Sequence, residues 1–465
     1  MATDTSPLER DLVTLLGEDA LRRGPEADSY LHDSTEMQGL AGRADAIVAP
    51  ANAEQVAELV AWCYEREVAI VPRGGGTGFA GGSVPMDGGV VLSLERLDRV
   101  RSLDPDFWRM ELEAGVRTGR VHQLTRENGL YFPPDPGASE QSQIGGNIAC
   151  NAGGPHSFKY GVTGAWVLGL EAVLPPGRLL RFGGPVRKDV AGYDVRSLLI
   201  GSEGTLGIVV SAWLRLVPAP EAQIPVAAVY RDVRAGVAAL RRVYGYGLVP
   251  ATLEYLDRGC VRATRAAFPK PLPEEAAFIV LAEADGTQDA ARALCRDLEE
   301  ALGEDALLVE TFDTLAEERA LWRWRSGVSF AVSAQRGGKM SEDIAVPFDA
   351  LEEAIGVVAE LEPVVGLPTC SWGHAGDGNL HATFMIDAHE AAEVERALEG
   401  TEELFARTLA LGGTVSGEHG LGWVKRRQFD RQFRPEAADL QRQLKGLFDP
   451  KHLLNPGKKV PPTPG

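Results

Sequence analysis

Alternation of apolar and polar positions predicts helices and strands in turn along the first half of the chain. A first helix is expected from Pro7 to Gly17, because Ser6 and Glu9 form a capping box and leucines recur on one face. The other elements expected before residue 220 are a helix at 53–66, strands at 68–71, 90–94 and 110–114, a helix at 118–128, a hairpin around 175–177 and a strand ending near 217.

Beyond a proline-flanked linker at 218–225, strands again alternate with helices. The expected strands are 226–230, 278–284 and 307–311, and the expected helices are 288–302 and 315–330. This is an α+β pattern, and 465 residues are too many for one compact core. We therefore expect two domains, 1–220 and 221–465.

Composition narrows the class of protein. The formal charge of −19 argues against a nucleic-acid or anionic-membrane surface, so a small anionic substrate needs local Arg and Lys side chains. The five cysteines include no C-x-x-C pair, which disfavours a four-thiolate zinc or iron–sulfur site. The N-terminus lacks a signal-peptide pattern, and no stretch reaches the roughly 18–20 apolar residues of a membrane span. A cytoplasmic location is the prediction.

Three glycine-rich segments, 72–82, 144–154 and 201–207, lie in the first half. Gly76, Gly78 and Gly81 spell G-x-G-x-x-G, but Pro85 and a strand follow instead of a helix, so the segment is not a Rossmann turn. Any one such segment is more often a tight structural turn. Three in one domain favour backbone N–H groups curled around a pyrophosphate. The loop expected at 133–154 is also of a length that is usually functional.

Histidine, acid and glycine come together in the second half. His374 and His381 flank an Asp-Gly turn signal, so their side chains can converge. Glu418 and His419 sit in a second glycine-flanked motif, and two imidazoles with one carboxylate are a common ligand set for a divalent metal. His389 lies at the start of a polar helix and is not included.

With these motifs the sequence resembles, from about residue 46 to 460, the FAD-linked D-2-hydroxy acid dehydrogenases of the vanillyl-alcohol oxidase type of flavin fold. That family includes the glycolate oxidase flavin subunit and D-lactate dehydrogenase. The resemblance implies an N-terminal FAD-binding domain and an α+β substrate-capping domain, with the tail from about 416 returning to the flavin.

The resemblance also implies a set of FAD contacts. FAD is expected to be non-covalent, because no His or Cys tether can be placed and His156, the nearest candidate, is interpreted as structural. Asn455 matches a return strand beside the flavin ring, although a plain loop after the helix ending at 448 explains it equally well. The implied cofactor residues are Pro72, Arg73, Gly74, Gly75, Gly76, Thr77, Gly78, Gly81, Gly82, Ser83, Pro134, Asp135, Pro136, Ser139, Gly145, Gly146, Asn147, Asn151, Gly153, Glu203, Gly204, Ile208 and Asn455.

The implied chemistry is hydride transfer from a 2-hydroxy acid to the flavin. The resemblance assigns His374, His381 and Glu418 as ligands of a divalent metal, zinc by preference with manganese open. It assigns His419 as the proton acceptor and Arg325 as the clamp on the substrate carboxylate, with Lys339 as a second candidate.

Three positions depart from relatives that oxidise 2-hydroxyglutarate. Ser329, Ser341 and Thr383 stand where those relatives carry Thr, Lys and Asn. The difference favours a smaller acid such as glycolate or lactate, and the D preference comes from the resemblance alone.

Other functions remain open on the sequence. The chain is also compatible with the flavin subunit of a glycolate oxidase-like complex that needs an iron–sulfur partner, with a non-redox synthase on the same fold, and with a flavin-binding protein without catalysis. The electron acceptor is unknown: a quinone, a cytochrome, an electron-transfer flavoprotein and an iron–sulfur subunit all fit, whereas NAD does not. A homodimer is one possible assembly, and any membrane association would be peripheral, through the acceptor.

Overall fold

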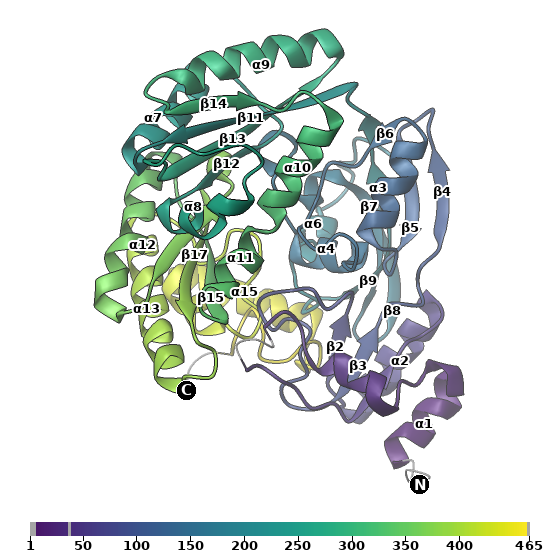
Figure 1. Ribbon diagram of the computed structural model, residues 1–465. Coiled ribbons are helices and arrows are strands. Elements are labelled where there is room, and N and C mark those ends of the chain that lie inside the picture. Colours follow the sequence, from purple (N-terminus) through teal and green to yellow (C-terminus); the bar gives the residue numbers. More distant parts are fainter. Residues whose placement is uncertain (1–5, 36–38, 463–465) are drawn as a thin grey trace. The chain divides into compact units, whose positions relative to one another are not determined.

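The computed structural model describes residues 6–35 and 39–462, which fall into two compact units (Figure 1). We call the chain up to Gly153, Val162–Ala219 and Glu418–Gly465 the N-terminal unit. Gly154–Gly161 and Pro220–Gly417 make up the C-terminal unit. Each unit combines helices with sheets, which confirms the α+β class.

The N-terminal unit contains a three-stranded parallel sheet, β1-β3-β2, and a five-stranded antiparallel sheet, β4-β5-β9-β7-β8. The strands are β1 (Ala46–Val48), β2 (Ile70–Arg73), β3 (Val90–Ser93), β4 (Val100–Asp104), β5 (Arg109–Glu113), β7 (Val167–Leu174), β8 (Arg178–Gly183) and β9 (Ile208–Arg215), with the short pair β6 (Leu130–Tyr131) and β10 (Val217–Pro218). The helices are α1 (Pro7–Leu16), α2 (Ala53–Arg66), α3 (Thr118–Glu127), α4 (Ile144–Cys150), α6 (Val195–Leu199), α14 (Phe429–Gln432) and α15 (Pro435–Phe448).

The predicted ends of α1 and α2 are found where the capping signals lie. The Ser6 hydroxyl accepts from the N–H of Glu9, and the Glu9 carboxylate accepts from the N–H of Ser6, so the capping box is complete. Asn52 caps α2 through the N–H of Gln55. Apolar faces of both helices pack on the parallel strands in one core cluster.

Three sequence predictions of elements are corrected. Strand β2 begins at Ile70 and not at 68. The loop expected at 133–154 contains α4, whose Ile144 and Ile148 are four residues apart and fully buried, a helical spacing that the surrounding glycines masked. The helix expected at 315–330 is two helices, α10 and α11, because the chain breaks at Gly327.

The C-terminal unit is built on a seven-stranded antiparallel sheet of order β14-β11-β13-β12-β16-β17-β15. Its strands are β11 (Ala222–Tyr230), β12 (Leu253–Leu256), β13 (Phe278–Gly286), β14 (Leu308–Thr311), β15 (Gly338–Ala345), β16 (Thr369–Gly373) and β17 (Asn379–Ile386). Its helices are α5 (Ser157–Tyr160), α7 (Val233–Gly245), α8 (Arg258–Thr264), α9 (Gln288–Gly303), α10 (Leu315–Ser326), α11 (Val328–Ala334), α12 (Leu351–Val365) and α13 (Ala391–Ala410).

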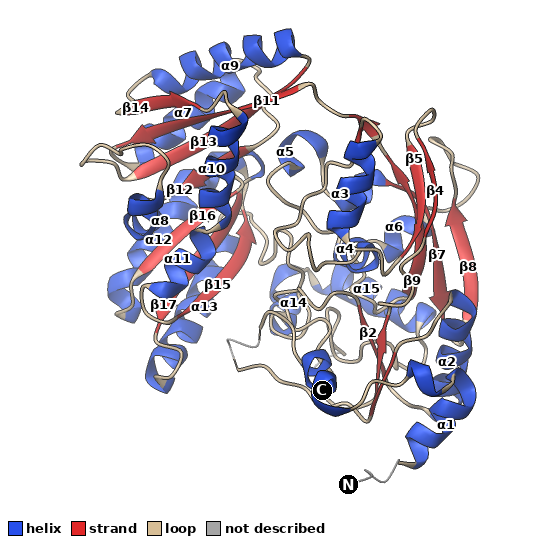
Figure 2. Ribbon diagram, turned by 45° about the vertical axis from the view of Figure 1, so that its right-hand side comes forward, coloured by secondary structure: helices blue, strands red, loops and turns tan. Residues whose placement is uncertain are grey.

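Both faces of this sheet are covered (Figure 2). Along β11, Val226 and Ala228 face the cluster formed with α7, α9, α12 and α13, whereas Ala227 and Val229 face the cluster that includes α8, α10 and α11. Because neighbouring residues of a strand point to opposite faces, a strand covered on both sides is apolar throughout. Polar side chains inside this sheet therefore need a separate explanation.

No helix among the described residues 6–35 and 39–462 has both the length and the apolar character that crossing a bilayer requires.

Candidate functional site

The candidate site lies on the sheet face that α8, α10 and α11 cover. Strand registers place Asp343 opposite His381 and Ser341 opposite Thr383 on the neighbouring strands β15 and β17. Trp372 of β16 pairs with His381 from the other side. Because paired residues on adjacent strands project from the same face, these side chains form one continuous row.

A short bend between β16 and β17 brings two imidazoles together. His374 follows β16 directly, and His381 lies in β17. Gly378, in the predicted Asp-Gly pair, has φ of +72°, and a Cβ there would collide with the carbonyl oxygen of Val346. The two rings are 5.5 Å apart between centroids and nearly perpendicular, at 87°. Both histidines are buried.

Glu418 provides a carboxylate to the same group. It is bonded to Gly417, the last residue of the C-terminal unit. One ligand atom from each of His374, His381 and Glu418 lies within 4.8 Å of the others. Two imidazoles and one carboxylate are a donor set that fits zinc or manganese.

Glu254, a residue that the sequence analysis missed, connects two predicted site residues. It lies in β12, is fully buried, and accepts hydrogen bonds from His374 Nδ1 through Oε1 and from Arg325 through Oε2. Burial alone would raise its pKa, but the charges of Arg325 and His374 outweigh burial and hold the pKa of Glu254 at about 2. The only sequence signal is an acid between the apolar residues Leu253 and Tyr255 of this strand.

Arg325, the predicted carboxylate clamp, projects from α10 toward this face. Its Nε donates to Glu254 Oε2 at 2.8 Å, and Nη2 donates to the same oxygen. The side chain is 11% exposed. The neighbouring Trp324 is buried and donates to the carbonyl oxygen of Thr264, which fixes this end of α10.

Lys339 lies further along the same face, on β15. Its Nζ donates to Ser329 Oγ and lies 5.1 Å from the ring centroid of Trp372. Burial lowers the pKa of Lys339 to about 8. Ser341 and Thr383 share a hydroxyl–hydroxyl bond of 2.8 Å. Of the three residues that depart from the 2-hydroxyglutarate pattern, Ser341 and Thr383 lie in this polar row, and Ser329 of α11 contacts Lys339 beside it.

His419 belongs to the N-terminal unit. Its ring stacks on Phe79, with centroids 4.8 Å apart and planes 29° apart, and its Nε2 lies 3.9 Å from Glu418 Oε1. The stacking fixes the plane of the imidazole. Its role as a proton acceptor stays a prediction.

The predicted cofactor residues of the N-terminal unit fall at strand ends and turns. Arg73 closes β2, and its buried guanidinium donates to the carbonyl oxygens of Ser29 and His32, so its side chain supports the loop. The remaining residues are found as follows: Pro72 in β2, Gly74–Ser83 in the next loop, Pro134, Asp135, Pro136 and Ser139 before α4, Gly145, Gly146 and Asn147 in α4, Asn151 and Gly153 after it, Glu203 and Gly204 before β9, Ile208 at the start of β9, and Asn455 in the tail.

Two adjacent glycines of α4 differ in what surrounds them. A Cβ on Gly145 would lie 2.6 Å from the Cβ of Ala114, so the fold itself requires a glycine there. A Cβ on Gly146 would meet no heavy atom within 4 Å, and its φ is not positive. A glycine inside a helix costs about 1 kcal/mol relative to alanine. Gly146 therefore fits a position that a bound group approaches closely, as a flavin nucleotide would.

The C-terminal tail is bound to these glycine segments within the same unit. Asn455 Nδ2 donates to the carbonyl oxygens of Gly82 and Glu203 at 2.8 and 2.9 Å. The Glu203 carboxylate accepts from the N–H groups of Leu421 and Gly422. Asn455 and Glu203 thus hold the tail against the loops, and the Glu203 carboxylate is already occupied by protein donors.

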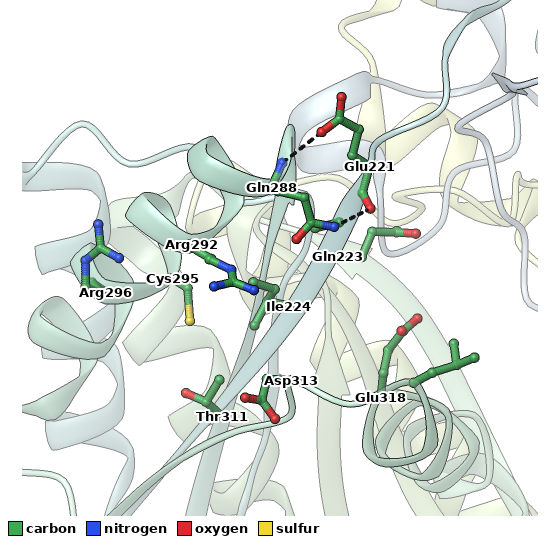
Figure 3. Close-up of a pocket in the computed structure, with 12 residues that line it drawn as sticks. Glu221, Gln223, Ile224, Gln288, Arg292, Cys295, Arg296, Thr311, Asp313 and Glu318 are labelled. Atoms are coloured by element: carbon green, nitrogen blue, oxygen red, sulfur yellow. Dashed lines mark hydrogen bonds between the residues drawn. The ribbon is translucent and has the colours of Figure 1, made fainter.

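A separate pocket of about 540 Å³ opens beside α9 and the start of β11 (Figure 3). Arg292, Asp313 and Glu318 line it. None of its lining residues is among the predicted site residues, and its charged side chains carry both signs. It is a surface groove of the C-terminal unit and not the candidate site.

Comparison with known families covers most of the chain. Residues 44–183 match the family model described as FAD binding domain. Residues 219–459 match the model described as FAD linked oxidases, C-terminal domain.

Curated relatives match over nearly their whole length. The glycolate oxidase subunit GlcD of Bacillus subtilis is 36% identical over 434 residues, covering 92% of this chain and 91% of the relative. The D-lactate dehydrogenase of Anaerostipes hadrus is 31% identical, covering 93% and 92%. The mitochondrial D-2-hydroxyglutarate dehydrogenase of Bos taurus is 34% identical, covering 91% and 78%.

Solved structures share the fold at low identity. A p-cresol methylhydroxylase with bound substrate is 19% identical, with a TM-score of 0.79 over 97% of this chain and 96% of that one. A 4-ethylphenol oxidase from Gulosibacter chungangensis is 19% identical, with a TM-score of 0.78 over 98% and 97%.

The two glycines of α4 give a test of the cofactor cradle. We expect Gly146→Ala to leave the FAD-free protein as stable as the parent or up to about 1 kcal/mol more stable, because helix propensity improves. The same change should weaken FAD binding, because the methyl group fills the approach. Fluorescence titration of FAD-free protein and thermal melts with and without FAD measure both effects.

The control is Gly145→Ala, which we expect to lower the melting temperature even without FAD, because its methyl group overlaps Ala114. A Gly146→Ala protein that binds FAD as the parent does would refute the cradle at α4.

Proposed function

The chain belongs to the FAD linked oxidases, and we propose that it oxidises a small D-2-hydroxy acid to the 2-oxo acid, with FAD and a divalent metal. Glycolate or D-lactate is the proposed substrate, since relatives named for each cover most of the chain. The observation that carries the proposal is the group of His374, His381 and Glu418, in which His374 shares the Glu254 carboxylate with Arg325.

FAD would be held by the glycine segments of the N-terminal unit. Gly146 supports this assignment, because the fold alone gives no reason for a glycine there. Bound FAD supplies the acceptor for the hydride from substrate C2, and a divalent metal supplies positive charge that favours loss of the proton on the 2-hydroxyl. Residues of the chain would hold the metal, bind the substrate carboxylate and accept the hydroxyl proton.

The metal would be held by His374, His381 and Glu418. Zinc is our preferred ion, and manganese suits the same imidazole and carboxylate donors. The buried Glu254 carboxylate accepts from His374 Nδ1, which leaves Nε2 of that ring as a ligand atom.

The substrate carboxylate needs cations in a chain whose formal charge is −19. Arg325 is the proposed clamp, and the Lys339 ammonium is a second cation on the same face. Ser329, Ser341 and Thr383 carry short hydroxyl side chains, which favours a small acid over a second carboxylate on the substrate. His419 is proposed to accept the hydroxyl proton, with its ring held by Phe79.

An alternative keeps the same chemistry but requires a partner. Two relatives are named as subunits of glycolate oxidase, so this chain could likewise pass electrons to an iron–sulfur subunit. A second alternative is a non-redox synthase, since alkyldihydroxyacetonephosphate synthase shares the fold with a TM-score of 0.76. At 18% identity this likeness concerns the fold alone.

Anaerobic mixing with paired D- and L-acids tests the proposed reaction. We expect D-lactate or glycolate to bleach the visible flavin absorbance and L-lactate to leave it unchanged. His419→Gln should slow bleaching by roughly 10²–10⁴-fold, the contribution of a general base. A flavin that no 2-hydroxy acid bleaches would favour the synthase, and bleaching without dye reduction by the purified chain would favour the partner-dependent enzyme.

Removal of the metal tests its assignment separately. A chelator should abolish bleaching while the flavin spectrum stays intact, and Zn²⁺ or Mn²⁺ should restore the rate. His381→Ala should lower metal affinity by more than about 100-fold, because a ligand contributes at least as much as an outer partner. His389→Ala is the control, since His389 is exposed and outside the ligand group. Equal metal content in both variants would contradict the assignment.

Lys339 predicts a pH dependence of substrate binding. Burial lowers its pKa to about 8, so the ammonium is charged below pH 8 and loses its charge as pH rises through that value. The thiols of Cys260 and Cys370 are the titratable groups that face it. We expect KM for the anionic substrate to rise about tenfold between pH 7 and 9, following one deprotonation.

Lys339→Met should raise KM at pH 7 and remove this rise. Lys270, which pairs with Glu317 and is not a proposed site residue, provides the control Lys270→Met, whose profile should match the parent. An unchanged profile in Lys339→Met would exclude Lys339 from the substrate site.

A further inference from the structure

Glu254 is a charged residue in the central strand of the seven-stranded sheet, β12, which lies beside β13 (Figure 1). It is fully buried, and the register places it opposite Leu281 of β13. A buried carboxylate costs several kcal/mol unless its oxygens are fully bonded, and apolar residues of similar size often stabilise a core as well or better. Stability of the fold alone is therefore a poor reason for an acid here.

The two oxygens of Glu254 serve different partners. Oε1 accepts from His374 Nδ1, and Oε2 accepts from both Nε and Nη2 of Arg325. A histidine that donates from Nδ1 keeps the lone pair of Nε2, so this bond selects the tautomer that binds a metal. The same carboxylate fixes the plane of the guanidinium, and Nη1 is the nitrogen of Arg325 that does not bond to Glu254.

We propose that Glu254 is a positioning residue that couples the metal ligand His374 to the carboxylate clamp Arg325. It presents Nε2 of the imidazole to the metal and the Nη1 side of the guanidinium to the substrate. The two halves of the site thereby share one anchor, so a disturbance of that anchor changes both metal binding and substrate binding. This inference rests on the proposed function.

Glu254→Gln in the FAD-loaded protein tests the coupling. The amide keeps the size of the side chain but loses the charge, and it carries N–H groups that cannot accept a bond. We expect zinc affinity, measured by competition with a chromophoric chelator, to fall about 10–100-fold, as for other outer partners of ligating histidines. KM should rise about tenfold or more, because a charged hydrogen bond to Arg325 is lost. The FAD content should not change.

Glu283→Gln is the matched control. Glu283 is also a buried acid of this sheet, on β13, and it accepts from His156, Gln223 and Trp322. None of these three partners is a proposed site residue. We expect this variant to lower the melting temperature at most, with zinc affinity and KM as in the parent.

A double-mutant cycle that combines Glu254→Gln with Arg325→Met distinguishes a positioning role of Glu254 from a merely structural one. If Glu254 acts on the substrate through Arg325, Glu254→Gln should raise KM far less in the Arg325→Met background than in the parent. Additive effects on KM, or a parent-like zinc affinity in folded Glu254→Gln protein, would overturn the inference. If Glu254→Gln does not fold, Glu254→Asp replaces it. Its carboxylate is one methylene shorter and cannot reach both partners, so parental values of both zinc affinity and KM would overturn the inference.

Measurements on the parent protein and on Glu254→Gln distinguish a failure of the proposed function from a failure of this inference. A parent protein that binds no zinc and is not bleached by any 2-hydroxy acid refutes the proposed function itself. A parent that does both, with a Glu254→Gln variant that behaves identically, refutes only the role of Glu254.

Discussion

The antiparallel register of β15, β16 and β17 is the constraint on which the candidate site depends. It places Asp343, His381 and Trp372 side by side, and it turns the polar residues of three strands onto the face under α10 and α11. A shift of one residue in β17 would move His381 to the opposite face, into the apolar cluster under α12 and α13. The bend at Gly378 secures this register, because only a residue without Cβ fits against Val346.

The sequence predicts the histidines of this site, but not the buried glutamate that connects His374 to Arg325. The histidines could be found because glycines and an Asp-Gly turn flank them, and turn chemistry is local. Glu254 could not be found, since its partners lie 71 and 120 residues away and the four residues of its strand carry no sign of them. Helix α4 was missed for a related reason: its apolar contacts at Ile144 and Ile148 override glycines that locally favour a loop.

Glycine density in the N-terminal unit has two physical origins, which the sequence alone does not separate. The fold requires glycine at positions 145 and 422, because a Cβ on Gly145 would overlap Ala114 and a Cβ on Gly422 would overlap Ala80. Gly146 and Gly82 have open space where a Cβ would be and no positive φ, so the fold leaves them unexplained. The second class leaves room for a bound group, and α4 and the loop after β2 stay the predicted surfaces for the nucleotide.

The chain as a whole is negatively charged, whereas the proposed contacts of the substrate carboxylate, Arg325 and Lys339, are cations. At physiological ionic strength, exposed charges are screened over about 8 Å, so most of the surface acids act weakly on an anion inside the site. Arg325 and Lys339 are partly buried, where screening is weaker, and the Glu254 carboxylate offsets the charge of Arg325. The carboxylates of Asp343 and Glu418 add negative charge to this group of residues, so a divalent cation proposed at His374, His381 and Glu418 would favour a bound carboxylate. The proposed metal would then act on the charge of the substrate as well as on its hydroxyl proton.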